Sequence, residues 1–339
     1  MTESLSALTP EERLRRLRAL AIAALDQWDL EVEAIEPLKV RENAVFAVRL
    51  RNGGRVALRV HRHGYHTDAA LQSEYLWLQA LGDSGIEVPV FMPTRDGRLF
   101  ALASTSDVPI PHQVDVLQWI EGNMLGALGE HMHGTEVDVH RVYGVVGELA
   151  AAMHNQASTW PRPPGFVRHA WDMEGLVGDR PLWGRFWELE ALKRHEADTL
   201  HALRARVRRD LQNFGTGADR FGLIHADLVP ENILVSGMTP RIIDFDDFGY
   251  GWHMFELATT LYFIRREPFY EEARDALIAG YRRQRSLSDE HVRLLPMFLA
   301  VRGTTYLGWV HTRHGEQVTR DLTPQLIELA LAAVSDYLD

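Results

Sequence analysis

Cysteine is absent from this chain of 339 residues. Without thiols the protein forms no disulfide, no thiolate zinc site and no cysteine nucleophile. Long apolar runs are absent too: the longest, around residues 298–310, is interrupted by Arg302 and falls short of the ~20 apolar residues that a membrane helix needs. No basic stretch precedes an apolar core near the N-terminus, so we expect no secretory signal and a soluble cytoplasmic protein without a membrane partner.

Positive charge is in deficit. Lys and Arg number 36 against 47 Asp and Glu, which gives a formal net charge of −11 at pH 7. A protein that coats nucleic acid needs a basic footprint, so we expect no nucleic-acid partner. The 46% of hydrophobic and 24% of charged residues exclude a disordered or fibrous protein. Because single hydrophobic cores stop growing near ~250–300 residues, the length predicts two lobes.

The first part of the chain has the apolar–polar alternation of β-strands. Strand-like segments lie over residues 35–61 and 86–120, and Asn52-Gly53-Gly54 turns the chain inside the first of them, which predicts a hairpin. Residues 68–81 instead follow a helical period of apolar side chains. Near residue 121 the pattern changes, and helical spacing prevails from there to the C-terminus.

We therefore predict an α+β fold of two lobes, a small β-rich N-lobe over residues 1–120 and a larger helical C-lobe over residues 121–339. The C-lobe also contains a short β segment over residues 221–245. His131 and His133 stand two apart in a glycine-flanked segment, which is poor spacing for metal ligands, and we expect an exposed loop there. The expected helices cover residues 10–27, 68–81, 137–157, 185–213, 253–266, 270–284, 288–310 (with a break at Pro296 as an alternative) and 323–337.

The densest cluster of chemically active side chains lies in residues 223–247. Apolar runs on either side of Ser236-Gly237 predict a hairpin. Asn232 precedes its first strand and Asp244 ends its second, so the two side chains can lie side by side. Two oxygen ligands there suit a hard divalent ion such as Mg²⁺. Asp227, five residues before Asn232, is close enough to orient a hydroxyl beside the metal.

These residue types meet the needs of phosphoryl transfer. Metal ions neutralise the phosphate oxygens, and a carboxylate accepts or orients the proton of the nucleophile. The Asp-x4-Asn spacing of Asp227 and Asn232 equals that of the kinase catalytic loop, and Asp244-Phe-Asp stands where Asp-Phe-Gly would. Asp and Asn are also common turn residues, but the joint spacing favours the functional interpretation. A metal hydrolase with His225 and Asp227 as ligands is another chemistry open to this segment.

Two motifs carry a resemblance to a known family. His225-Ala-Asp-Leu-Val-Pro-Glu-Asn-Ile-Leu resembles the His-Gly-Asp-Leu-x-x-x-Asn-Ile-Leu of the aminoglycoside phosphotransferase and choline kinase-like family of small-molecule kinases. Ile243-Asp-Phe-Asp resembles its metal-binding motif, and the chain is particularly similar to the homoserine-kinase-like and stress-response-kinase branch. Weaker similarities over most of the chain begin at Glu42, Val56, Trp119 and Leu149.

The resemblance implies a protein-kinase-like fold of two lobes and an enzyme that moves the γ-phosphoryl group of Mg·ATP to a hydroxyl. The acceptor would be a small molecule of the amino alcohol, amino acid or aminoglycoside type, with ATP and Mg²⁺ as cofactors. Asp227 would be the catalytic base, Asn232 and Asp244 would bind Mg²⁺, and His225 would mainly hold the loop.

The nucleotide would be bound by the N-lobe. No Gly-x4-Gly-Lys-Ser/Thr phosphate loop occurs, which argues against a P-loop enzyme. The segment Val-Ala-Leu-Arg59 resembles the kinase Val-Ala-Ile-Lys strand, so Arg59 would reach the phosphates and Glu74 would pair with it. A guanidinium in place of the usual ammonium can still clamp phosphate oxygens bidentately. The alternative for this pair is a plain surface ion pair.

Backbone groups would complete the nucleotide site. Asn43 lies in a loop that would cover the phosphates, and Gln118 and Ile120 are hinge candidates that would face the edge of the adenine. For these three residues a purely structural role is an equal alternative.

The acceptor would be bound by the C-lobe. Aromatic side chains near an acid suit a cationic amine through cation–π contact, whereas an arginine suits a carboxylate. Both features are present, so the sequence leaves the class of acceptor open. Aromatic residues of this kind are also typical of a hydrophobic core. The candidates are Tyr250, Trp252, Glu256, Arg302, Tyr306 and Trp309.

A small-molecule acceptor is favoured over a protein. Ala226 stands where many regulated protein kinases have an Arg that meets a phosphate on a long activation loop, and the next helical run begins at residue 253, soon after the metal-binding motif. A protein Ser/Thr kinase of the stress-response type is the alternative. A non-catalytic nucleotide-binding regulatory protein is a further one, motivated by Arg59 and Asp246, which stand where Lys and Gly are usual.

Overall fold

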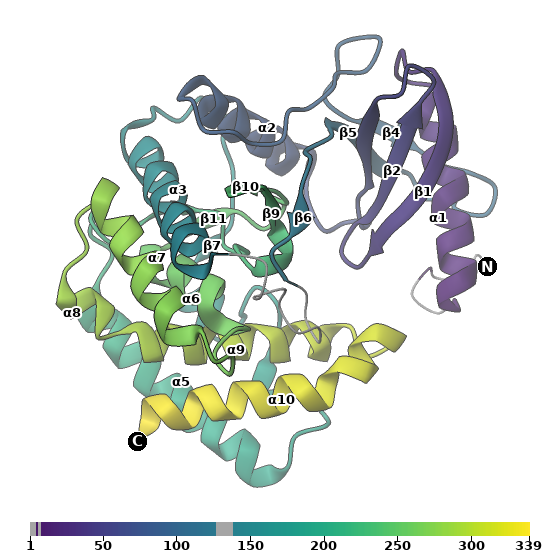
Figure 1. The fold of residues 1–339 in the computed structure, drawn as a ribbon. Coiled ribbons are helices and arrows are strands. Elements are labelled where there is room, and N and C mark those ends of the chain that lie inside the picture. The colour runs from purple at the N-terminus through teal and green to yellow at the C-terminus, as the bar shows by residue number, and fades with distance from the viewer. Residues whose placement is uncertain (1–4, 6–7, 127–137) are drawn as a thin grey trace. The chain divides into compact units, whose positions relative to one another are not determined.

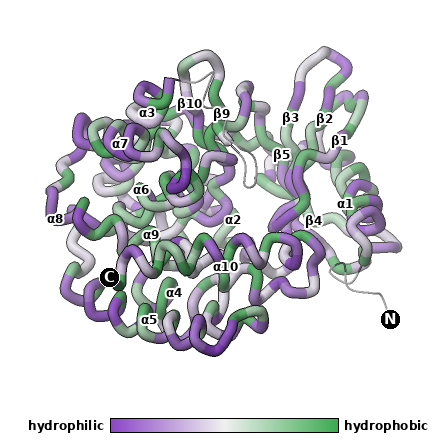
Figure 2. The backbone as a smooth tube through the Cα atoms, turned by 60° about the horizontal axis from the view of Figure 1, so that its bottom comes forward, coloured by the Kyte–Doolittle hydropathy of each residue, from purple (hydrophilic) through white to green (hydrophobic). Residues whose placement is uncertain are grey.

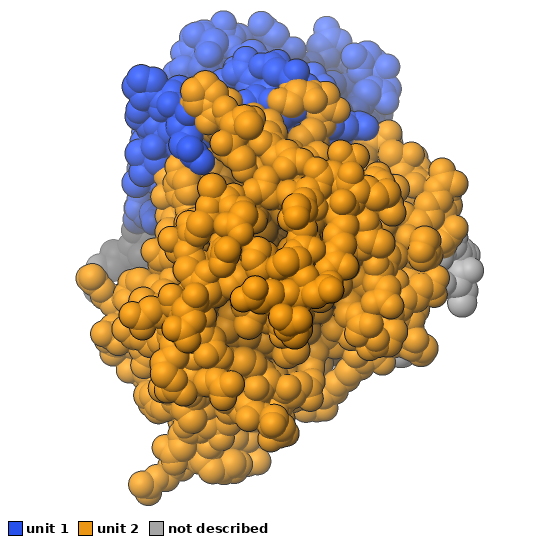
Figure 3. Space-filling model, turned by 90° about the vertical axis from the view of Figure 1, so that its left-hand side faces the viewer, with its two compact units in different colours: residues 1–83, 87–120, 162–167 blue, residues 84–86, 121–161, 168–339 orange. Residues whose placement is uncertain are grey.

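The computed structural model describes Leu5, residues 8–126 and residues 138–339. The loop expected around His131 and His133 lies outside the described residues. The chain forms two compact units (Figure 3). Unit 1 comprises residues 1–83, 87–120 and 162–167, and unit 2 comprises residues 84–86, 121–161 and 168–339.

Unit 1 is built on a five-stranded antiparallel sheet with the order β1-β2-β3-β5-β4 (Figure 1). The expected hairpin is formed by β2 and β3, and Gly53 turns the chain between them with a φ of 84°, which suits a residue without Cβ. The strands are β1 (Val32–Val40), β2 (Ala44–Leu50), β3 (Arg55–Val60), β4 (Ala101–Ala103) and β5 (His112–Gln118), and the helices are α1 (Pro10–Leu25) and α2 (Asp68–Asp83).

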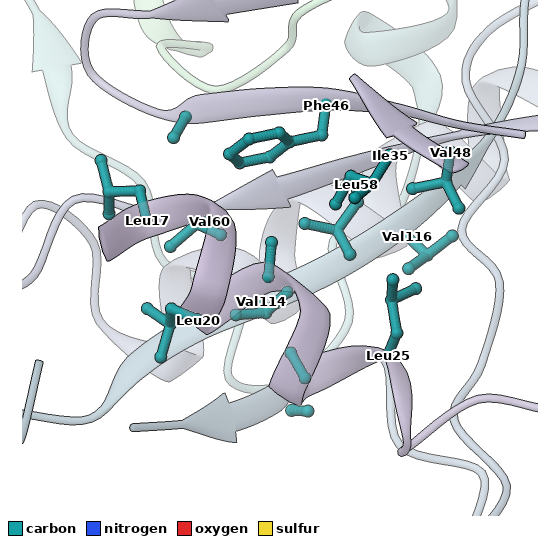
Figure 4. Close-up of a cluster of buried hydrophobic side chains, with 14 of the residues drawn as sticks. Leu17, Leu20, Leu25, Ile35, Phe46, Val48, Leu58, Val60, Val114 and Val116 are labelled. Atoms are coloured by element: carbon teal, nitrogen blue, oxygen red, sulfur yellow. The ribbon is translucent and has the colours of Figure 1, made fainter. Parts of the chain in front are cut away.

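Helix α1 packs on one face of this sheet and closes a hydrophobic core (Figure 4). Pro10 occupies its first turn, and the Thr9 hydroxyl accepts a hydrogen bond from the Glu12 amide, so the helix begins where the sequence predicts. Side chains alternate along a strand, so Arg59, between Leu58 and Val60 of this core, points to the opposite face. The core side chains labelled in Figure 4 are Leu17, Leu20, Leu25, Ile35, Phe46, Val48, Leu58, Val60, Val114 and Val116.

Unit 2 is mostly helical, which confirms the expected α+β organisation. Helix α9 is buried along nearly its whole length, and Figure 2 shows its apolar character beside that of α6. No helix within the described ranges combines the length and the apolar character that a membrane crossing requires. The helices are α3 (Val139–Thr159), α4 (Met173–Val177), α5 (Arg194–Phe214), α6 (His253–Tyr262), α7 (Tyr270–Gln284), α8 (Asp289–Val292), α9 (Leu295–Thr312) and α10 (Gln317–Leu338).

Several helix ends differ from the expected ones. The helix expected from residue 185 begins at Arg194, where Glu196 accepts a hydrogen bond from the Lys193 amide, and only the single turn η2 (Phe186–Glu188) precedes it. Pro296 stands in the first turn of α9, so α8 and α9 are separate helices. Pro324, expected near a helix start, lies inside α10, because that helix begins six residues earlier, at Gln317, and buries its apolar stripe.

Two small sheets of unit 2 carry the segment singled out from the sequence. They have the orders β10-β9-β6 and β7-β11-β8. The predicted hairpin is formed by β9 and β10, which turn at Gly237 with a φ of 62°. The strands are β6 (Asn123–Met124), β7 (Ala170–Trp171), β8 (Phe221–Ile224), β9 (Ile233–Ser236), β10 (Thr239–Ile242) and β11 (Gly249–Trp252), and the turn η3 (Pro230–Asn232) precedes β9.

Candidate active site

Asp227 and Asn232 lie together in the loop between β8 and β9. The Asn232 amide donates hydrogen bonds to the carbonyl of Asp227 at 2.8 Å and to its carboxylate at 2.9 Å. Asn232 is buried, whereas the side chain of Asp227 is 21% exposed and can meet a ligand. With its NH₂ group turned towards Asp227, Asn232 keeps its amide oxygen for another partner.

Asp244 follows β10 and is brought next to this loop by the hairpin. Ile243, the residue before it, donates a backbone hydrogen bond of 3.0 Å to the carbonyl of Asn232. An amide oxygen and a carboxylate make a donor set that fits Mg²⁺, which takes a few protein oxygens and fills its other positions with water and phosphate. The described residues hold no group of three or more His, Asp and Glu side chains that would bind a metal by themselves.

The backbone is strained at the residue before Asp227 and at Asp244 itself. Ala226 has a φ of 67° and Asp244 a φ of 65°, and no other non-glycine residue within the described ranges has a positive φ. Such a conformation costs on the order of 1–3 kcal/mol and persists where the surrounding structure enforces it. The family motif has glycine at the position of Ala226. The backbone strain here therefore arises because this chain carries alanine, which has a Cβ, at that position.

His225 holds the loop from the inside. Its Nδ1 accepts the Asp227 amide at 3.2 Å, which leaves Nε2 to donate to the carbonyl of Ile243 at 3.0 Å. Burial lowers the pKa of His225, so the ring is neutral, as this pattern of one acceptor and one donor requires. The imidazole thus ties the loop that carries Asp227 to the strand end that carries Asp244.

Glu256 of α6 also supports the loop that carries Asp227. Its two carboxylate oxygens accept the amides of His225 at 2.7 Å and Ala226 at 2.8 Å, and the side chain is fully buried. Burial raises the pKa of Glu256. Sequence reasoning placed Glu256 in an acceptor site, but both of its oxygens are engaged by backbone amides and it has no exposed surface. The structure makes it the anchor of the strained Ala226 backbone.

The other acceptor candidates differ in exposure. Trp252 is a core residue, 1% exposed, whose indole donates to the carbonyl of Gly215 at 2.8 Å. Arg302 is also fully buried, and it donates to the carboxylate of Asp227. Tyr250 and Tyr306 are half-buried and retain surface that a ligand can reach, whereas Trp309 is a core residue that is 8% exposed.

Arg168 and strand β7, which sequence reasoning missed, hold the backbone that follows Asp244. Arg168 donates to the carbonyls of Asp246 and of Phe248, the latter at 2.7 Å. The Trp171 indole donates to the carbonyl of Asp247 at 2.9 Å. These contacts fix the backbone just after the proposed metal ligand. No periodicity marks the segment, because the strand is only two residues long.

Arg59 and Glu74 of unit 1 form a buried ion pair. The guanidinium donates to Glu74 at 2.9 Å, and the two side chains are 5% and 1% exposed. The surface ion pair that was the alternative interpretation is therefore excluded. Sequence reasoning missed a second acid, Asp115 of β5, which lies opposite Arg59 in the sheet register and accepts two hydrogen bonds from it at 2.9 and 2.8 Å.

Asp115 is ionised in spite of its burial. Burial alone would raise its pKa, but the Arg59 guanidinium and His61, 2.7 Å away, hold the pKa of Asp115 at about 2. In the sequence, the only sign of this buried acid is that Asp115 is a polar residue between the core residues Val114 and Val116. Strand pairing, which the sequence does not specify, decides that it faces Arg59.

The remaining nucleotide-site candidates lie at two ends of the unit 1 sheet. Asn43 is buried in the turn between β1 and β2, and its side-chain oxygen has no hydrogen-bond partner among the described residues. An unsatisfied buried amide oxygen is costly, and a ligand atom can satisfy it. Gln118, at the end of β5, is exposed, and Ile120 two residues later is half-buried.

Comparisons with known proteins agree with the motifs. Residues 34–294 match the model of the APH family, described as a phosphotransferase enzyme family. A homoserine kinase of Rhizobium meliloti is 26% identical over 92% of this chain and 89% of its own length. The amicoumacin kinase of Bacillus subtilis is 24% identical over 71% of this chain and 69% of its own length.

A solved structure gives the same result for the fold. A microcompartment-associated aminopropanol kinase superposes with a TM-score of 0.79 at 30% identity, over 94% of this chain and 95% of that one. The family and the kinase-like fold expected from the motifs are thereby confirmed. The chain belongs to the APH phosphotransferase family, and it is a kinase that transfers phosphate to a hydroxyl group.

Proposed function

We propose that this enzyme transfers the γ-phosphoryl group of Mg·ATP to a hydroxyl of a small molecule of the amino alcohol, amino acid or aminoglycoside type. The observation that carries the proposal is the hydrogen bond of 2.9 Å between the Asn232 amide and the Asp227 carboxylate, beside the strand end that bears Asp244. The relatives support the acceptor class, since homoserine and aminopropanol are small hydroxyl compounds that carry an amine.

The reacting groups of unit 2 have distinct tasks. Asp227 accepts the proton that the acceptor hydroxyl loses as its oxygen attacks the γ-phosphorus, while the bond from that phosphorus to ADP breaks. Asn232 and Asp244 hold the Mg²⁺ ion, which neutralises charge on the phosphate oxygens. His225 and Glu256 hold the loop that carries these side chains in place and do not touch the substrates.

Unit 1 supplies the groups that bind ATP. Asp115 already holds the Nε–Nη2 fork of Arg59 that a bidentate phosphate clamp needs, so Arg59 contacts the phosphates through Nη1 or Nη2 without such a clamp. The carboxylates of Glu74 and Asp115 fix its guanidinium in one orientation. Asn43 approaches the phosphates from the turn between β1 and β2. Gln118 and Ile120 offer backbone groups to the adenine at the end of β5.

The acceptor is contacted by aromatic side chains of unit 2. Tyr250 and Tyr306 have the exposed surface that such a contact needs. Their ring faces suit an apolar or cationic part of a small molecule. Trp252, Glu256 and Arg302 support this region from within the core.

The experiment is an acceptor screen with Mg·ATP. The panel contains 1-amino-2-propanol, homoserine, choline, amicoumacin, an aminoglycoside and a Ser/Thr peptide, with ADP release as the readout and mass spectrometry to locate the phosphate. The Asp227→Asn variant is the matched control. We expect a phosphate ester on at least one small amino compound and none in the variant.

Two results of the screen would contradict the proposal. Phosphate on the peptide alone would favour the protein kinase alternative. ATP binding without phosphate on any acceptor, with equal behaviour of the Asp227→Asn variant, would favour a regulatory nucleotide-binding protein.

A further inference from the structure

A buried arginine touches the proposed catalytic carboxylate. Arg302 of α9 has no exposed surface, and its Nη2 donates to Oδ1 of Asp227 and, at 2.5 Å, to the hydroxyl of Tyr306. Its Nη1 donates to the carbonyl of Ala226 at 3.2 Å. One guanidinium therefore binds both the side chain of Asp227 and the strained residue before it.

Three aromatic rings enclose the same guanidinium. Its carbon lies 4.5 Å from the ring centre of Tyr306, 5.2 Å from that of Trp183 and 5.7 Å from that of Phe255. These rings come from three separate parts of unit 2. Such an enclosure attracts an organic cation. Here the cation is a side chain of the protein, so a substrate ammonium group has no room among these rings.

Electrostatics makes the pair mutually dependent. Moving a charge out of water costs several kcal/mol unless a partner compensates it. The carboxylate that compensates Arg302 is Asp227. At the same time Asn232 holds the other oxygen, Oδ2, of Asp227. With one donor on each oxygen, the orientation of the carboxylate is fixed.

We propose that Arg302 is a positioning residue that locks the carboxylate of Asp227 and fills the aromatic enclosure beside it with the enzyme's own cation. This inference rests on the proposed function, in which Asp227 takes the proton of the acceptor hydroxyl. It also removes Arg302 from the residues that bind an acceptor carboxylate, because the side chain has no exposed surface and its Nη1 and Nη2 are engaged inside the core. The charged group of an acceptor is then recognised elsewhere, at the exposed surface of Tyr250 or Tyr306.

Chemical rescue tests the proposal. Arg302→Ala leaves an aromatic-walled space of the size of a guanidinium group. We expect kcat to fall by about 10²-fold, as for a misplaced catalytic group, while the KM for ATP stays nearly unchanged. Methylguanidinium added to this variant should restore activity, and Arg302→Lys should retain part of it.

The matched control is Arg204→Ala. Arg204 is a half-buried arginine of α5 that lies 3.6 Å from the ring centre of Trp187 and donates to the carbonyl of Gly178 at 2.7 Å, without touching Asp227. We expect this variant to keep the wild-type kcat and to gain nothing from methylguanidinium. Wild-type kcat in Arg302→Ala, or a loss that neither methylguanidinium nor lysine reverses, would overturn the inference.

A second measurement needs no activity. Melting temperatures of Arg302→Met, Asp227→Asn and the double variant form a cycle. If the two side chains compensate one another, the double variant melts at a higher temperature than the sum of the two single shifts predicts, whereas additive shifts would overturn the inference. A wild-type enzyme that phosphorylates no acceptor would refute the proposed function instead, and the melting cycle would then decide the role of Arg302.

Discussion

Asp227 is the residue on which turnover depends. Asp227→Asn removes the proton acceptor but preserves the shape of the side chain, so we expect kcat to fall by about 10²–10⁴-fold. The dissociation constant of ATP should change little, because no role in nucleotide binding falls to this carboxylate. Steady-state kinetics and calorimetric titration with ATP measure the two quantities. A variant with normal kcat would remove Asp227 from the mechanism.

Asp244 is expected to act through the metal. Asp244→Ala deletes one of the two protein ligands, so the Mg²⁺ concentration for half-maximal activity should rise by about tenfold or more. Activity measured across a magnesium titration gives this value. As the control we choose Asp83→Asn, an exposed carboxylate at the end of α2. An unchanged magnesium dependence in Asp244→Ala would place the metal elsewhere.

Asp115 links stability to pH. Its pKa is about 2 in the folded chain against an ordinary value of 3.8, so it adds stability above pH 3.8 that is lost as the pH falls through 2. The shift corresponds to about 2 kcal/mol at neutral pH. Asp115→Asn should lose at least about this amount at pH 7, and the difference from the wild type should shrink below pH 4. Urea unfolding at both pH values measures it, and a difference that does not depend on pH would contradict the assignment.

At the scale of the elements, the close contact of α3 and α7 depends on glycine. A Cβ on Gly280 would lie 1.9 Å from the carbonyl oxygen of Gly144, which forces the two helices apart. We expect Gly280→Ala to lower the free energy of unfolding by about 3 kcal/mol. Thermal and urea unfolding provide the measurement.

Helix α2 offers the matched substitution. Nothing lies within 4 Å of a Cβ added to Gly82, so Gly82→Ala should raise the free energy of unfolding by about 0.5–1 kcal/mol through helix propensity alone. If both alanine variants changed the free energy of unfolding equally, helix propensity, and not the spacing of α3 and α7, would explain the effect of Gly280→Ala.

Elements were predictable where the sequence period was strong. Helix α7 begins at Tyr270 and ends at Gln284, as expected, and both hairpins turn at the glycines that the sequence marks. The first residues of α5 and α10 were missed, because a cap at Lys193 and the packing of α10 outweighed the local signals, whereas their last residues were predicted to within one position. Periodicity reports which face is apolar, whereas a helix end depends on single hydrogen bonds.

For the molecule as a whole, the loop that carries the reacting groups was predictable from the sequence. The side chains that hold the site residues in place were not. The spacing of Asp227 and Asn232 is local, so the sequence alone indicates that they meet. Asp115, Arg168 and the anchoring role of Glu256 depend on strands and helices distant in sequence, which a single sequence does not place. Fold class and family were therefore within reach, and the tertiary partners of each site residue were not.

Residues 162–167 leave the larger unit and return to the smaller one, where the amide of Val167 donates to the hydroxyl of Ser73 on α2 at 2.8 Å. A chimera with a related kinase that crosses over only at residue 120 would pair one parent's α2 with the other parent's returning segment. Transplanting residues 1–120 together with 162–167 should give the higher melting temperature of the two hybrids. A stable hybrid of this enzyme and a relative therefore needs both segments, residues 1–120 and residues 162–167, from the same parent.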